Sequence, residues 1–304
     1  MSTTDISSQS PARQHRAPPA RWLRTSLDDG FMREAALVAA AILAYFTIRN
    51  VTAGAPAEAF ANGHRVADFE GWLGIDWEDG IQGAIAGRDA LVTLANWIYI
   101  WGHWPVILST AVALHVWRRD SYYQLRNTLF ISGGIGFLFF ALFPVAPPRL
   151  LEMGLVDTVS DQSHAYRALQ PPGLTNQYAA FPSLHVGWNL AVGIVLFMST
   201  THLAVRTLAV LSPLAMTSAV VATANHYLVD VAGGTAVVLV GLAGAYFIQT
   251  RKAVPLARLA DDEPAVPVEH PRRRAAPILR RPPRREPALR PPRRRAPQPD
   301  PCRS

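Results

Sequence analysis

The sequence predicts an all-α, polytopic membrane protein with about six transmembrane helices in a bundle. Half of the 304 residues are apolar and only 17% are charged, whereas soluble domains carry about 25% charged residues. Six apolar segments recur along the chain, and most approach the ~20 residues that cross a hydrocarbon core of ~30 Å. Several of them are rich in Gly and Ala, which favour close packing of helices in lipid.

The elements follow one another in a simple order. Residues 1–30 are polar and basic, and they contain no apolar core with a small-residue cleavage site, so we interpret them as a flexible lead-in. Residues 31–250 form the membrane domain. We interpret residues 91–99 as an additional half-helix, and we expect Pro105 to kink the second span. The six expected spans are 31–51, 97–117, 129–145, 182–200, 203–224 and 228–248.

The C-terminal segment, residues 251–304, differs in composition from the rest. It contains 14 Arg, one Lys and six acidic residues, a net charge of +9, so residues 1–250 sum to −2. It also holds 13 of the 25 prolines and the single cysteine, Cys302, which excludes an intrachain disulfide. We expect a disordered tail that is attracted to anionic lipids of the inner leaflet. No folded reader accompanies the charge, so we do not expect nucleic-acid binding.

Two short motifs flank the fourth and fifth apolar segments. The first is Phe-Pro-Ser-Leu-His at 181–185, where Pro182 suits the first turn of a helix. Ser183 and His185 would then lie at a helix N-terminus, which favours a bound anion such as phosphate. In the second motif His226 precedes Asp230 by four residues, so on a helix the carboxylate would orient the imidazole. Together the motifs predict a phosphoryl-transfer site.

The distribution of charge predicts the orientation in the membrane. Basic residues near the spans lie on one side for six crossings, which should be the cytoplasmic side and should hold both termini. The acidic loop between the first two spans belongs outside, and Phe69, Trp72 and Leu73 in it have the spacing of a short interfacial helix. Arg149, His185 and His226 all fall on this outer face. We therefore expect a plasma-membrane protein with an extracytoplasmic site.

These motifs, with Pro-Pro-Arg at 147–149 upstream, resemble the type 2 phosphatidic acid phosphatase superfamily. The nearest resemblance is to the inositolphosphotransferase-like branch, which contains the fungal inositol phosphorylceramide synthase. The resemblance covers residues 30–250 and implies a six-span helical enzyme that cleaves or transfers lipid phosphates through a phosphohistidine, without a metal or other cofactor. Its expected partner is a membrane lipid substrate, while the sequence does not define an oligomeric state.

The resemblance also implies roles for individual residues. His226 would be the nucleophile, Asp230 would orient it, and His185 would protonate the leaving oxygen and later activate the acceptor. Arg149 and Ser183 would bind phosphate. The superfamily has Gly, Lys and Arg where this chain has Leu184, Leu142 and Val220, so two phosphate-binding cations are missing, as in the inositolphosphotransferase-like branch. Candidates to replace them or to bind substrate are Arg167, His164, Tyr166, Asn225, Tyr178 and Asn176.

Three alternatives remain at this point. Within enzymes, hydrolysis and transfer differ only in whether water or an alcohol accepts the phosphoryl group. A transporter or lipid-moving protein without chemistry would show midplane polar residues and an inverted repeat, and the sequence shows neither. A metal site built from His185, His226 and Asp230 would have a spacing that matches none of the usual zinc patterns.

Overall fold

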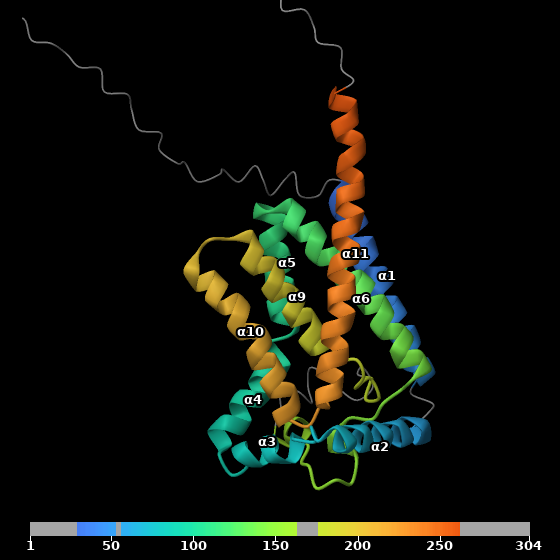
Figure 1. Cartoon of the computed structure of the whole chain (residues 1–304), viewed down its shortest axis with the longest axis vertical. Coiled ribbons are helices and arrows are strands. Elements are labelled where there is room, and N and C mark those ends of the chain that lie inside the picture. Colours follow the sequence, from blue (N-terminus) through green and yellow to red (C-terminus); the bar gives the residue numbers. More distant parts are fainter. Residues whose placement is uncertain (1–28, 53–55, 163–175, 262–304) are drawn as a thin grey trace, which may run out of the picture. The chain divides into compact units, whose positions relative to one another are not determined.

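The predicted all-α fold is confirmed. The computed structural model describes residues 29–52, 56–162 and 176–261, and within these ranges it contains helices and one isolated β-bridge but no strand (Figure 1). The chain divides into two compact units after Arg258, and nearly all the described residues belong to the first. The helices are α1 (Asp29–Thr52), α2 (Pro56–Leu73), α3 (Glu78–Ile85), α4 (Asp89–Trp101), α5 (Trp104–Trp117), α6 (Arg119–Leu142), the 3₁₀ turn η3 (Pro148–Leu150), α7 (Thr158–Gln162), α9 (Leu184–Ser199), α10 (Leu203–Ala222) and α11 (Leu228–Asp261).

All six expected apolar segments are helical, and among the described residues three helices are long and apolar enough to cross a membrane. These are α6, α10 and the Leu228–Arg251 part of α11. The α4–α5 pair adds a fourth crossing if it is counted as one bent span. Helix α9 is apolar but has 16 residues, a length of about 24 Å at 1.5 Å per residue. It is therefore shorter than the ~30 Å hydrocarbon core.

The break predicted in the second span is confirmed. Helices α4 and α5 meet at an angle of 45°, and Pro105 lies in the first turn of α5. A proline at this position loses no intrahelical hydrogen bond, because the first N–H groups of a helix have no partner within it. The break leaves His103, the residue before α5, buried inside the bundle.

Two helix boundaries differ from the prediction by ten residues or more. Helix α6 begins at Arg119 rather than at residue 129, because its first turns are fixed by polar contacts rather than by apolar ones. There the Tyr122 hydroxyl donates to a Glu34 carboxylate oxygen of α1 over 2.9 Å, and Arg126 forms an ion pair with the same carboxylate. Helix α11 continues to Asp261 rather than ending at 248, and the added turns contain Pro255 among several good helix formers. Residues 1–28 and 262–304 lie outside the described part of the chain.

Helices α2 and α3 lie across one end of the bundle, where α10 ends and α11 begins (Figure 1). The predicted short helix in the acidic loop is thus confirmed as part of α2. Its Phe69, Trp72 and Leu73 side chains are exposed, and the rings of the first two stack at 5.9 Å. The opposite side of α2 is buried and includes Asn62, whose amide donates to the Pro144 carbonyl over 2.9 Å.

Helices α9 and α11 are in backbone contact near their N-termini. A Cβ on Gly234 of α11 would overlap the carbonyl oxygen of Ser183, and one on Gly187 of α9 would come within 2.6 Å of the Gly234 carbonyl oxygen. Only glycine allows two helices to approach this closely. The contact places the beginning of α9 directly against the first turns of α11.

The outer surfaces of the helices are apolar, as a bilayer requires. Exposed large apolar side chains include Trp117 of α5, Leu203 of α10 and Val240 of α11. The buried residues form separate clusters between the helices. One cluster, around Tyr99, Met216 and Val220, lies where α4 packs on α10. The described part of the chain is therefore a helical membrane bundle.

Candidate active site

His226 lies in the turn between α10 and α11. The turn begins at the end of α10, where the Val220 carbonyl accepts the N–H groups of Asn225 and His226 over 3.0 and 3.2 Å. Ala224 adopts a φ of +53° within it, a conformation that costs a non-glycine residue about 1–2 kcal/mol. Its carbonyl accepts the N–H of Arg149 over 3.0 Å, so the surrounding structure holds the strained turn in place.

The hydrogen bonds of His226 fix its tautomer. Its Nδ1 lies 2.8 Å from the carbonyl oxygen of Ala180 and 3.3 Å from Oδ2 of Asp230. A carbonyl oxygen only accepts hydrogen bonds, so Nδ1 carries the proton. In the neutral ring Nε2 is then unprotonated, and its lone pair is available to attack an electrophile.

Asp230 connects the two sequence motifs. It is fully buried in the first turn of α11, where its Oδ2 also accepts the Tyr227 N–H over 2.9 Å. Its backbone carbonyl accepts the N–H of Ser183 over 3.0 Å. His226 itself precedes α11, which begins at Leu228. The segment is therefore not helical at His226, and the carboxylate reaches back from the helix to the turn to orient the imidazole.

His185 is in the first turn of α9. Ser183 is the N-cap of this helix, and its hydroxyl accepts the Val186 N–H over 3.4 Å. Pro182 therefore precedes the cap, and its predicted place in the first helical turn is wrong. The His185 ring lies between those of Tyr99 and His103, at centroid distances of 4.7 and 4.3 Å. It lies 5.6 Å from the His226 ring, so the two predicted histidines meet.

His103 and Asn189 are members of this cluster that the sequence analysis missed. The Asn189 amide lies 3.4 Å from His103 Nδ1 and donates to the His185 carbonyl over 2.9 Å. Its carbonyl oxygen accepts a hydrogen bond from Ser212 of α10 over 3.3 Å. Both residues are buried. A His at the break of an apolar span and an Asn within another are polar groups at membrane depth, which is the signal that could have identified them.

Arg149 lies beside the turn that carries His226. Its side chain is 7% exposed, and Nε forms an ion pair with Asp157 at 3.3 Å. Its Nε and Nη1 atoms are buried and have no hydrogen-bond partner among the described residues. A buried guanidinium with unused donors is a strong candidate to bind an anion.

The remaining candidates have local bonds or lie outside the described residues. The Asn225 amide donates to the Thr223 carbonyl and hydroxyl oxygens over 3.2 and 2.9 Å. Asn176 accepts the Tyr178 N–H over 3.2 Å. Positions 142 and 220 hold apolar side chains, so neither supplies a cation. Leu142 is exposed, and Val220 is buried in the core. Three of the candidates, Arg167, His164 and Tyr166, lie outside the described residues.

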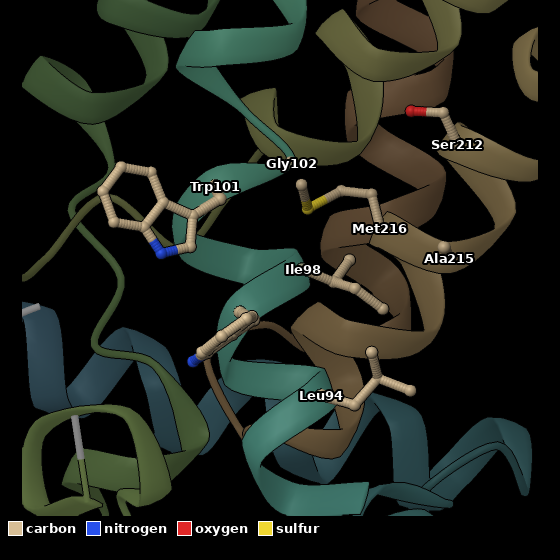
Figure 2. Close-up of a pocket in the computed structure, with 8 residues that line it drawn as sticks. Leu94, Ile98, Trp101, Gly102, Ser212, Ala215 and Met216 are labelled. Atoms are coloured by element: carbon tan, nitrogen blue, oxygen red, sulfur yellow. The ribbon is translucent and has the colours of Figure 1, made fainter. Parts of the chain in front are cut away.

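An apolar pocket of about 800 Å³ lies between α4 and α10. Figure 2 shows Leu94 and Ile98 of α4 next to Ala215 and Met216 of α10, with Trp101 at its edge. Ser212, which bonds to Asn189, also lines this pocket. One hydrogen bond, from Ser212 to Asn189, therefore connects the lining of the pocket with the polar cluster around His185.

Comparison with known proteins shows the family of the chain. The family model described as PAP2 superfamily matches residues 64–244, more than half of the chain. The chain belongs to the PAP2 superfamily. No curated protein and no solved structure matches it. As a PAP2 superfamily member, the protein is a helical membrane enzyme of the lipid-phosphate phosphatase type. Among the described residues no group of three His, Cys, Asp or Glu side chains could hold a metal ion.

Proposed function

We propose that the protein is an integral-membrane lipid phosphatase or phosphotransferase that works through a phosphohistidine on His226. The observation that carries this proposal is the tautomer of His226. The Ala180 carbonyl and the Asp230 carboxylate hold its Nδ1 proton, which leaves the Nε2 lone pair as a nucleophile. An imidazole held in this way needs no metal to attack phosphorus.

The reaction has two steps. In the first, Nε2 of His226 attacks phosphorus, the P–O bond to the leaving group breaks, and His185 donates a proton to the leaving oxygen. In the second, the oxygen of water or of an alcohol attacks phosphorus and gives its proton to His185, while the P–N bond breaks. The 5.6 Å between the two rings supports this division of roles, because both groups must reach one phosphorus centre.

The charge on the phosphate would be neutralised by Arg149 and by the start of α9. The unused Nη1 donor of Arg149 supports the first contact. The second rests on the first N–H groups of α9, which have no partner within the helix and favour an anion. Because catalysis of phosphoryl transfer depends mainly on such electrostatic stabilisation, we propose that these groups replace the cations missing at 142 and 220.

The substrate we propose is a phospholipid or a polyprenyl phosphate or pyrophosphate. The apolar pocket between α4 and α10 supports a substrate with an aliphatic chain, since its lining is apolar and its Ser212 is hydrogen-bonded to Asn189 of the histidine cluster. Leu184 and the absent cations at 142 and 220 favour the inositolphosphotransferase-like branch, in which an alcohol is the acceptor. We also propose that the site faces the extracytoplasmic side of the plasma membrane, with both termini in the cytoplasm.

The test uses purified protein in detergent with EDTA and a panel of lipid phosphates, pyrophosphates and phosphatidylinositol, with and without inositol. Phosphate release that disappears in His226→Ala would establish a phosphatase, and a new phosphodiester lipid that disappears would establish a transferase. His202→Ala, at an exposed histidine before α10, is the matched control. Turnover that survives in His226→Ala would refute the nucleophile, and no turnover on any lipid would favour a transporter or lipid-moving protein.

A further inference from the structure

Three carboxylates occupy the N-terminus of α11. The Tyr227 N–H donates to Asp230 over 2.9 Å, and the next two N–H groups donate to side chains from other helices. Leu228 N–H donates to Glu78 of α3 over 3.0 Å, and Val229 N–H donates to Glu70 of α2 over 2.6 Å. A helix normally satisfies its first N–H groups with water or one capping residue. Here two of the three acceptors come from segments about 150 residues away.

Glu70 and Glu78 must lie close to each other, because they accept from consecutive N–H groups. Both are buried, Glu70 completely. Two buried carboxylates side by side cannot both ionise without a large penalty, so one of them retains a proton. Oε2 of Glu70 is buried and has no hydrogen-bond partner among the described residues. A proton on this atom is the one that would bridge to Glu78, because a side-chain hydrogen bond with Glu78 is among the causes that raise the pKa of Glu70.

Among the described residues, the charged groups that line the pocket beside Glu70 are acidic. A pocket of about 340 Å³ is lined by both glutamates, by Asp68 and Asp76, and by Tyr227 and Pro148. Asp230 acts on Glu70 from the α11 side. Burial raises the pKa of Glu70 to about 8, the bond from Val229 N–H opposes this shift, and Glu78 and Asp230 add to it. The proton is therefore held at neutral pH and lost in mildly alkaline solution.

We propose that Glu70 and Glu78 are positioning residues, a proton-sharing pair that clamps the first turn of α11 and thereby holds Asp230 and His226 in their catalytic geometry. The inference rests on the proposed function of His226. Figure 1 shows why the clamp acts there: α2 and α3 lie across the end of the bundle at which α11 begins. Loss of the shared proton places a second negative charge in the pair and weakens its hold on the turn.

The first test is amide hydrogen exchange of the full-length protein in detergent, which needs no turnover. Glu70→Ala should reduce the protection of the Val229 amide at least tenfold. Glu70→Gln should preserve it, since an amide oxygen accepts the same bond and its NH₂ group takes the place of the bridging proton. Asp68→Asn and Asp76→Asn are controls, because both residues line the same pocket. Unchanged protection in Glu70→Ala would overturn the clamp.

The second test is the dependence of turnover on pH. Wild-type kcat should fall as the pH rises from 7 to 9, and Glu70→Gln should lose this decline while KM stays constant. Glu70→Ala should lower kcat about tenfold across the range. A decline that persists unchanged in Glu70→Gln would overturn the shared proton. If the wild type turns over no lipid, the proposed function fails, while loss of wild-type Val229 protection between pH 7 and 9 still decides the clamp.

Discussion

The role of Asp230 can be tested quantitatively, because the structure separates its two contributions to His226. One is to hold the proton on Nδ1, and the other is to stabilise the positive charge that develops on the ring. The Ala180 carbonyl lies closer to Nδ1 than the carboxylate does, at 2.8 against 3.3 Å. The carbonyl should therefore maintain the tautomer in Asp230→Asn, and only the charge should be lost.

The expected magnitude follows from this separation. A hydrogen bond to a charged group contributes about 1.5–3 kcal/mol, and about 1.4 kcal/mol corresponds to a factor of ten in rate. We therefore expect kcat of Asp230→Asn to fall by roughly 10- to 150-fold, with KM almost unchanged. His226→Ala should lack detectable turnover, because it removes the nucleophile itself.

The assay measures phosphate release from one lipid phosphate in detergent with EDTA, over a range of substrate concentrations that separates kcat from KM. Thermal melting of both variants confirms that they are folded, which matters because Asp230 also accepts the Tyr227 N–H. A loss in Asp230→Asn as complete as that in His226→Ala would refute the reasoning. It would mean that the Ala180 carbonyl does not maintain the tautomer.

Three further changes have defined outcomes, and Gly134→Ala serves as the control for the second of them. Arg149→Lys should lower kcat/KM by about 10- to 100-fold in the same assay, because a lysine lacks the planar set of donors; an unchanged value would exclude it as a phosphate ligand. Gly234→Ala should lower the melting temperature, since the methyl group would overlap the Ser183 carbonyl and overpacking costs about 1–3 kcal/mol. Gly134→Ala has free space and should melt unchanged or higher. His103→Phe should reduce kcat roughly fivefold, as expected for about 1 kcal/mol of a lost hydrogen bond, and no reduction would make the contact incidental.

The sequence predicted the features that depend on local pattern. The apolar segments are helical, the span around Pro105 is broken, and the acidic loop contains a helix with Phe69 and Trp72 on its surface. The approach of His185 to His226 also followed from topology alone, because both motifs fall at span ends on the same side. These features can be recognised in a single sequence because helix periodicity and bilayer thickness determine where apolar residues fall along the chain.

Contacts between distant segments could not be predicted in this way. Nothing near Glu70 or Glu78 indicates that they accept from α11, since isolated acidic residues in a polar loop are normally solvated. The early start of α6 depends on Glu34, whose partners lie about 90 residues away. Arg167, which the resemblance made a candidate, lies outside the described residues. A pairwise contact leaves no signal in one chain unless its members share a local motif.

The close approach of α9 and α11 has a consequence for how the site tolerates change. Because Gly187 and Gly234 bring the two backbones together, the distance between His185 and His226 is set by main-chain atoms rather than by core side chains. Residues on the lipid-facing surfaces of the bundle can then be substituted without changing this distance. Any separation of α9 and α11 would therefore also change the distance between the two histidine rings.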